Sequence, residues 1–316
     1  MSHDPAGFDA LVRPHADAVL DLIGVHEDAL ERRWVTPSAD APVLGQIAEQ
    51  RRFAMPGAST PIDQAITLGV QYTIAGCDHA RSICTLVTAE PAVIYSDKIL
   101  LRSAVEAMAR GAWLLAPTIP AGERCRRLAN ELLHARTRTL SAAKRVDRDE
   151  GTDRAAELGQ RRDELAAAAI AHGLGEIGRS RYDVWVGKPR PTATKVIAQL
   201  LDEDKDPESD LGPTLQGFYS EFVHSNIGAL HYQLVTDDLP GTPPTGDIIS
   251  APLASSAHDV QMTLQFAATA LLIAATEMRT LLGWRDVEWA DAIRRSWPVL
   301  RKIGGGESES TGRLTQ

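Results

Sequence analysis

The sequence has few cysteines, few aromatic residues and no long hydrophobic run. Cys77, Cys84 and Cys125 are the only cysteines among 316 residues, and an odd number without a CxxC pair excludes a disulfide framework or a zinc ribbon. The most apolar run, 266–275, is shorter than the roughly 20 residues that span a bilayer. The N-terminus, which contains charges and proline, does not resemble a signal peptide. We therefore expect reduced thiols and a soluble, cytoplasmic protein with no membrane partner.

The signatures of several common enzyme classes are also missing. The chain has no glycine-rich phosphate loop, nucleophile elbow or HExxH motif, which argues against kinases, dehydrogenases, α/β-hydrolases and zinc proteases. Acidic residues outnumber basic ones by 42 to 33, and the formal net charge is −9. Because this charge repels a phosphate backbone over long range, we expect no general DNA binding.

What the chain does have is helix-forming sequence. Alanine and leucine dominate, alternating β-branched runs are nearly absent, and the helical period governs almost every segment between proline- and glycine-rich loops. The pattern predicts an all-α, multi-helix bundle with one extended piece at 182–186. The predicted helices cover about 9–31, 61–88, 96–115, 120–144, 154–172, 194–201, 213–235, 256–282 and 286–302.

The capping and loop residues between these helices indicate how the chain is organised. Threonine at position 60 is expected to cap the second helix, and the preceding connector carries an exposed-looking Gln50. The short connection after Leu115 predicts an antiparallel pair of helices, and the charged stretch 145–153 predicts a solvated loop. We divide the chain into an N-terminal helix and connector (1–60), a helical bundle domain (61–303) and a disordered tail (304–316).

The helix predicted over 96–115 carries polar groups along the border of its apolar face. At about 100° per residue, Arg102, Glu106, Arg110 and Trp113 lie together. The simplest interpretation is an ion-pair ladder on a solvated face. The alternative is a half-buried polar site that holds a network between helices, or orients a histidine from another helix.

The helix predicted over 213–235 offers such a histidine. Its wide apolar face leaves Ser220, His224 and Gly228 on the opposite side. A solvated histidine is the simpler interpretation. The small residues beside His224 would nevertheless permit close approach of a second helix, and such a groove could bury the imidazole.

Two segments resemble a known superfamily. Residues 102–106 with the Trp-Leu-Leu helix end at 113–115, and the segment 220–225, resemble a group of bacterial all-helical proteins similar to the HEPN superfamily. The resemblance spans about 96–232. It implies a HEPN-like core with additional N- and C-terminal helices, a homodimer, an RNA partner, and metal-independent RNase activity in defence or toxin–antitoxin systems. It implies catalytic roles, without metal or cofactor, for Arg102, Glu106, Ser220 and His224.

The chain departs from the HEPN pattern beside the histidine. Gly217, Phe218 and Tyr219 stand where an arginine should precede His224. If RNA is cleaved, the imidazole would act as general acid or base toward the ribose 2′-hydroxyl. Arg102 of a second copy would then stabilise the developing charge.

Two other functions remain open. Glu131-x-x-His134 and Glu221-x-x-His224 match the ligand spacing of a di-iron carboxylate oxidase. Against it, the helical period places His134 on a polar side with Asn130 and several arginines, whose charges repel a metal cation. The last alternative is a non-catalytic helical interaction module, in which the polar groups form a structural network.

Overall fold

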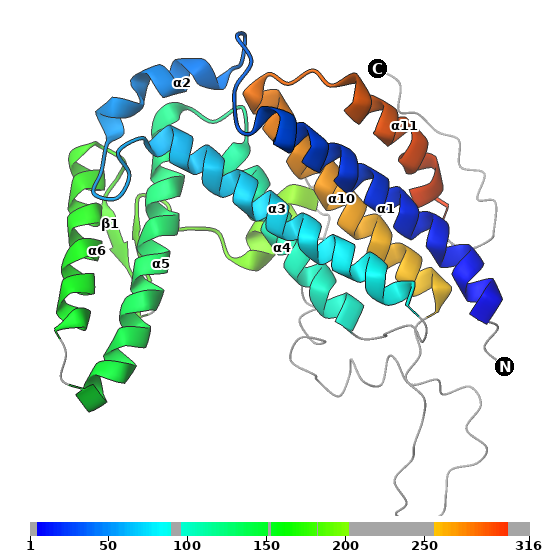
Figure 1. Cartoon of the computed structure of the whole chain (residues 1–316). Helices are drawn as coiled ribbons and strands as arrows, with labels where there is room; N and C mark the ends of the chain where they lie inside the picture. The colour runs from blue at the N-terminus through cyan, green and yellow to red at the C-terminus, as the bar shows by residue number, and fades with distance from the viewer. Residues whose placement is uncertain (1–4, 90–95, 151–152, 182, 202–255, 303–316) are drawn as a thin grey trace, which may run out of the picture.

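The computed structural model describes residues 5–89, 96–150, 153–181, 183–201 and 256–302. Within these ranges the chain forms nine α-helices, one short 3-10 helix and a two-stranded antiparallel sheet (Figure 1), so the predicted all-α helical bundle is confirmed. None of the described helices is both long and apolar enough to span a membrane. The helices are α1 (Pro5–Arg33), α2 (Val43–Glu49), α3 (Pro61–Val87), α4 (Ser96–Leu115), α5 (Ala121–Glu150), α6 (Arg154–Ala171), α7 (Ala193–Leu201), α10 (Ala257–Leu282) and α11 (Val287–Leu300), with the 3-10 helix Gln50–Phe53 and the strands β1 (Ile177–Arg179) and β2 (Val184–Val186).

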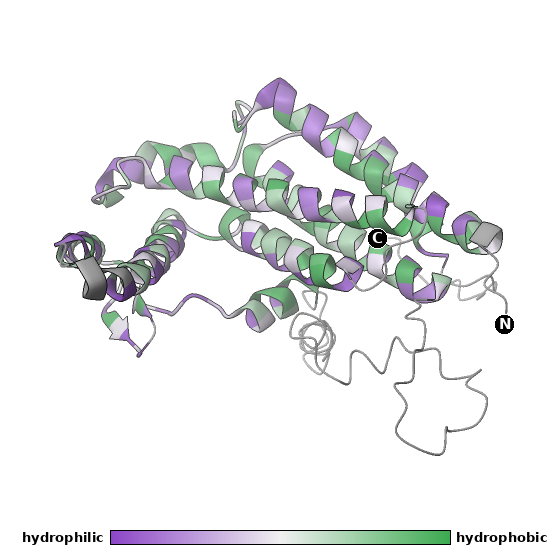
Figure 2. Cartoon of the chain, turned by 60° about the horizontal axis from the view of Figure 1, so that its bottom comes forward, coloured by the Kyte–Doolittle hydropathy of each residue, from purple (hydrophilic) through white to green (hydrophobic). Residues whose placement is uncertain are grey.

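The larger core lies between α1, α3, α4, α7, α10 and α11. In Figure 1 the helices α1, α3, α4, α10 and α11 run side by side, and Figure 2 shows that their hydrophobic residues gather in stripes. The first helix therefore shares the core of helices that follow residue 61. The two helices that approach most closely, α3 and α4, do so through glycine: a Cβ atom at Gly111 would lie 2.8 Å from the carbonyl oxygen of Gly69, which leaves no room for a side chain.

A second core joins α2, α3, α5, α6, β2 and the C-terminal end of α10. In Figure 1 α5 and α6 form a separate pair at the left of the molecule. The prediction that the helices on either side of Pro117 form an antiparallel pair is wrong, because α4 packs mainly on α3 and α10 whereas α5 packs mainly on α6. The turn between them is fixed by the buried Arg124 guanidinium, which donates hydrogen bonds to the carbonyl oxygens of Leu114 and, at 2.8 Å, Ala116. These are among the carbonyls that the end of α4 leaves without a helical partner.

The connector before α3 is more ordered than predicted. It contains α2 and the 3-10 helix, and Gln50 is buried. Thr60 makes no capping hydrogen bond with its side chain. Instead, Oε1 of Gln50 accepts a hydrogen bond of 3.2 Å from the backbone N–H of Asp63, and its Nε2 donates to the Asp63 carboxylate at 2.8 Å. A residue 13 positions away in the chain thus performs the cap expected of the adjacent threonine.

Two further boundaries differ from the sequence prediction. The helix α5 continues to Glu150, so most of the stretch predicted as a loop is helical; it has no glycine or proline to end the helix. The extended piece predicted at 182–186 is confirmed over Val184–Val186 as β2, and it pairs with β1, for which no strand was predicted. In this pair the indole of Trp185 covers Gly178, where a Cβ atom would lie 2.2 Å from the ring.

Candidate functional site

The predicted polar border of α4 is a half-buried polar seam between helices rather than a solvated face. Nη2 of Arg110 donates to Oε1 of Glu106 at 2.9 Å, and Nε donates to the same oxygen at 3.1 Å. The Arg110 side chain is only 7% exposed and that of Glu106 30%. The i,i+4 pair therefore exists, but as a half-buried site of the kind that the alternative interpretation predicts.

Glu131 of α5 is the centre of this seam. Its Oε1 accepts a hydrogen bond of 2.6 Å from Nε of Arg190 and lies 3.7 Å from Nη1 of Arg110, and its Oε2 accepts one of 3.0 Å from the Tyr72 hydroxyl. Burial and the neighbouring carboxylate raise the pKa of Tyr72, so it remains a hydrogen-bond donor at neutral pH. The Glu131 network, defined as Tyr72, Glu106, Arg110, Glu131 and Arg190, joins α3, α4, α5 and the segment after β2.

The residue next to Glu131 anchors the β-hairpin. Asn130 is buried, its Oδ1 accepts from the backbone N–H of Val186 at 2.8 Å, and its Nδ2 donates to the carbonyl of Lys188 at 2.8 Å. The helical period placed Asn130 on the polar side of its helix, and the structure shows that this residue is nevertheless buried. The hairpin and the segment after it cover that side, and this packing was not visible in the helical period of α5 alone.

The first Glu-x-x-His motif has the surroundings of an ion-pair network. Glu131 faces two arginines, and Nδ1 of His134 lies 3.1 Å from Oδ2 of Asp183 on the hairpin. Across the described ranges, no group of three or more histidine, cysteine, aspartate or glutamate side chains is arranged to hold a metal ion. The second motif, Glu221-x-x-His224, lies outside the described residues.

The structure places two of the four residues predicted to be catalytic. Arg102 and Glu106 lie on α4, where Glu106 binds Arg110. Within the described residues, Nε of Arg102 is buried and has no hydrogen-bond partner. Ser220 and His224 fall outside the described residues.

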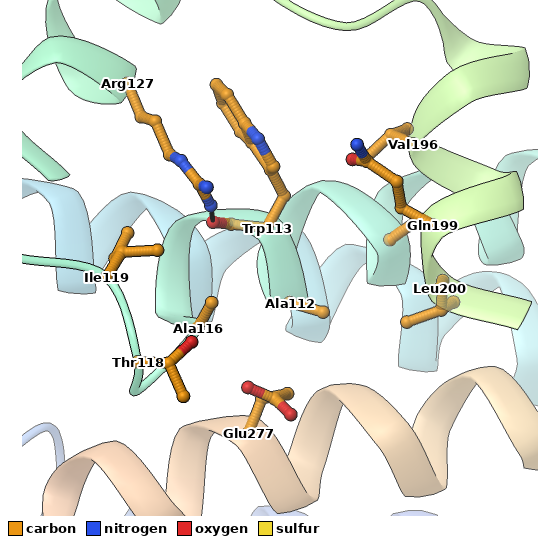
Figure 3. Close-up of a pocket in the computed structure, with 11 residues that line it drawn as sticks. Ala112, Trp113, Ala116, Thr118, Ile119, Arg127, Val196, Gln199, Leu200 and Glu277 are labelled. Atoms are coloured by element: carbon orange, nitrogen blue, oxygen red, sulfur yellow. Dashed lines mark hydrogen bonds between the residues drawn. The ribbon is translucent and has the colours of Figure 1, made fainter. Parts of the chain in front are cut away.

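A cavity opens one turn beyond the seam, where α4, α5, α7 and α10 meet. This α4–α7 slot has a volume of about 230 Å³, and Figure 3 shows the side chains around it. Small and apolar residues form most of its wall, with polar groups at four positions. The lining residues are Ala109, Ala112, Trp113, Ala116, Thr118, Ile119, Arg127, Val196, Gln199, Leu200 and Glu277.

The polar groups of the slot come from three helices and from the connector between α4 and α5, which carries Thr118. The Arg127 guanidinium lies 4.9 Å from the centre of the Trp113 ring and donates to the backbone carbonyl of the same residue. Its Nε also donates to Oε1 of Glu123 at 2.9 Å. Burial lowers the pKa of Arg127, while Glu123 acts against that change. Gln199 of α7 and the carboxylate of Glu277 on α10 line other parts of the wall (Figure 3).

Sequence reasoning included Trp113 in the polar border but missed the slot. One local signal was present: Ala109 and Ala112 on α4, and Ala116 directly after its end, recur at helical spacing, and such small residues leave space beside a helix. Nothing local indicated that Glu277 of α10 and Gln199 of α7 would line the same space.

Comparison with known proteins identified no relative of this chain. No family model matches the chain. Searches of the curated proteins and of the solved structures likewise found no match. The function must therefore be argued from the site itself.

Proposed function

We propose that this chain is a non-catalytic helical binding protein and that its α4–α7 slot holds a small amine. The observation that carries the proposal is the slot itself, a concave space of about 230 Å³ whose wall combines apolar side chains with four polar ones, a form that small-ligand sites take. Alanines and Leu200 would contact the apolar part of the ligand. Thr118, Gln199 and Glu277 would contact its polar end.

We place the ammonium group of the ligand beside Glu277. The charged lining residues of the slot are Arg127 and Glu277. Arg127 already binds Glu123, a carboxylate that it shares with Arg126, and donates to the Trp113 carbonyl. The Glu277 carboxylate can accept several hydrogen bonds, and an ammonium group supplies three donors and a positive charge.

The Glu131 network supports a role in binding rather than in catalysis. Its members neutralise one another and are mostly buried, so they bind each other and not a substrate. Buried, mutually bonded charges fix the relative positions of the elements that carry them. The network thereby holds α4 against α5 directly beside the slot and preserves the shape of the cavity.

The proposal is tested by ligand-dependent thermal stability of the full chain. We expect n-butylamine or benzylamine to raise the melting temperature, because a ligand that binds only the folded state stabilises it. Butyrate at equal ionic strength is expected to have no effect. Glu277→Gln should remove the response to the amines, and Ala116→Leu should remove it by filling the slot.

The matched control for Glu277→Gln is Glu288→Gln. Glu288 pairs with Arg32 on the surface, outside the slot, and its side chain is 57% exposed. This variant should respond to the amines as the parent does. The proposal fails if neither amine stabilises the parent, or if Glu277→Gln responds as strongly as Glu288→Gln.

A second candidate function is metal-independent RNA cleavage by a HEPN-like homodimer in the cytoplasm. The observation that favours it is Arg102, whose half-buried guanidinium has a buried Nε without a hydrogen bond in the described part of the chain. Such a group can stabilise the negative charge that develops on the phosphate during cleavage. In this proposal the imidazole of His224 transfers the proton and Ser220 lies beside it in the dimer groove.

The experiment for this candidate is cleavage of labelled RNA in excess EDTA, with the oligomeric state measured by light scattering. Cleavage should disappear in His224→Ala and persist in His258→Ala, whose histidine is exposed on α10. Cleavage that survives His224→Ala removes this residue from the reaction, and a parent protein that cleaves no RNA removes the candidate.

A further inference from the structure

A larger cavity lies on another side of α10, away from the α4–α7 slot. It has a volume of about 490 Å³ and shares no lining residue with the slot. Its wall is formed by the C-terminal end of α10, the start of α11 and the loop that precedes α2. The lining residues are Asp40, Pro42, Thr276, Arg279, Thr280, Gly283, Trp284, Arg285, Asp286 and Trp289.

The wall of this cavity contains a buried group of charges. Arg279 and Asp286 have side chains that are 5% and 2% exposed, with Nε of Arg279 3.4 Å from Oδ2 of Asp286. Oδ1 of the same carboxylate lies 2.7 Å from Nη2 of Arg33. One carboxylate is therefore shared between two guanidinium groups.

The neighbouring His26 adds no charge to this group. Burial and the nearby Arg279 lower the pKa of His26 to about 3, so its imidazole is neutral at pH 7. Nδ1 of His26 lies 2.8 Å from Nη1 of Arg279, which donates to it. Arg33, Arg279 and Asp286 together carry one positive charge that no carboxylate among them offsets.

Arg279 also has donors that the described protein does not use. Among the described residues, its Nη2 forms no hydrogen bond and is buried. Burial lowers the pKa of Arg279 to about 10, which still leaves the group charged at pH 7. An oxyanion beside this guanidinium would satisfy the donor and offset the excess charge at the same time.

Two indole rings give the cavity rigid, flat walls. The Arg279 guanidinium lies 4.1 Å from the ring centre of Trp289, and that of Arg33 lies 5.5 Å from the ring centre of Trp284. Nε1 of Trp284 donates to the carbonyl of Thr36 at 2.9 Å, which fixes its ring against the loop. Both tryptophans line the cavity, and flat apolar bodies pack well against such rings.

We propose that this cavity binds a small anion in which a carboxylate or phosphate group is joined to a flat apolar ring. The oxyanion lies beside Arg279, and the ring lies against Trp284 and Trp289. Arg285, which binds Asp40 at 2.9 Å and is largely exposed, stands at the entrance. Two neighbouring arginines and the carboxylate that they share thus give the site its preference for a negatively charged ligand.

Binding can be measured by calorimetry and by quenching of tryptophan fluorescence in the full chain. Benzoate and phenyl phosphate are the anionic probes, and benzamide is the neutral probe of the same shape. At least one anion is expected to bind at least about tenfold more tightly than benzamide, as one charge-assisted contact contributes. Comparison of benzoate with phenyl phosphate shows which oxyanion the site prefers.

A blocking variant separates the cavity from the buried charges that support the fold. Thr280 is exposed and lines the cavity, so Thr280→Phe should fill the space, weaken anion binding at least about tenfold and leave the ligand-free melting temperature near that of the parent. The matched control is Thr85→Phe, at an exposed position of α3 outside the cavity, which should bind as the parent does. Equal binding of benzamide and the anions, no anion binding by the parent, or parental affinity in Thr280→Phe would each overturn the proposal.

Discussion

Nε of Arg190 donates a hydrogen bond of 2.6 Å to Oε1 of Glu131, across 59 positions of the sequence. This bond ties the segment after β2 to α5, and Arg110 of α4 approaches the same carboxylate oxygen. A single buried carboxylate thus contacts two arginines from different parts of the fold, and Glu106 supplies the second negative charge through its bond to Arg110.

Removing that charge should destabilise the protein strongly. Glu131→Gln leaves Arg190 without its carboxylate and Arg110 with Glu106 alone, and breaking a buried ion pair in this way typically costs about 3–5 kcal/mol. Urea denaturation followed by circular dichroism measures the loss. The control is Glu157→Gln, where a 59% exposed carboxylate pairs with Arg161 and where a change below about 1 kcal/mol is expected. Equal losses in the two variants would contradict the role assigned to Glu131.

The cap of α10 should contribute measurably to stability. Ser256 accepts from the backbone N–H of Asp259 at 3.1 Å, and Asp259 bonds back to the N–H of Ser256 at 3.3 Å, which forms a capping box. Ser256→Ala is expected to lower the free energy of unfolding by about 1 kcal/mol. The exposed Ser82, in the C-terminal part of α3, provides the comparison, since Ser82→Ala should change the free energy of unfolding by less than about 0.5 kcal/mol.

Two glycines with the same backbone conformation should differ in their tolerance of alanine. Gly173 and Gly283 have φ angles of 72° and 67°. Because an alanine disfavours this left-handed conformation, either alanine variant should lower the free energy of unfolding by about 1–2 kcal/mol. A Cβ atom at Gly173 has no atom within 4 Å, whereas at Gly283 it would lie 2.9 Å from Cα of Ala41. Gly283→Ala should therefore be the more destabilising in thermal melts; an equal or smaller effect would show that the loop at Ala41 moves aside freely.

The buried histidines should make stability decrease as the pH falls. The folded-state pKa of His26 is about 3, and that of His15 is also lowered, both chiefly by burial. Below about pH 6.5 the unfolded chain binds protons that the folded chain does not, so each histidine lowers stability by up to about 1.4 kcal/mol per pH unit, and for His26 this continues toward pH 3.

The contribution of the histidines can be isolated by urea denaturation between about pH 7 and pH 5, because most carboxylates titrate below this range. The parent should lose stability across it, and His26→Gln should lose less. The ring resonances of His26 give a second measurement that needs no variant: they should not titrate above about pH 5. A His26 resonance that titrates near pH 6.5 would contradict the buried, neutral state.

The three thiols should be inert in the folded protein. Cys77, Cys84 and Cys125 are buried, and burial raises the pKa of each to about 12. Because the thiolate is the reactive form, an aromatic disulfide reagent should react slowly with the native protein and rapidly after unfolding in guanidinium. Rapid reaction of one thiol in the native state would identify a cysteine that the fold exposes.

Local sequence predicted the helices well where their ends are encoded by nearby residues. The pattern from Ser96 to Leu115 gave the bounds of α4 as observed, and Ser256 was correctly placed at the start of α10. Predictions were wrong where a distant residue decides the outcome. Gln50 supplies the cap expected of Thr60, and Trp185 covers Gly178 to complete a strand pair.

The candidate site, too, could be predicted only where nearby residues decide it. The helical period placed Arg102, Glu106, Arg110 and Trp113 on one border of α4, and the bond between Glu106 and Arg110 agrees with it. The choice of Glu131 as their partner, and of Glu277 as a neighbour of Trp113 in one cavity, depends on how α5 and α10 cross α4.

The order of amino acids by itself determined that this chain is helical and where most helices lie, because helix formation depends on residues three or four positions apart. Tertiary structure alone decided which polar side chains are buried together and where the cavities open. Those outcomes depend on the angles and distances at which helices pack, and these are set by the summed fit of many side chains from distant parts of the sequence.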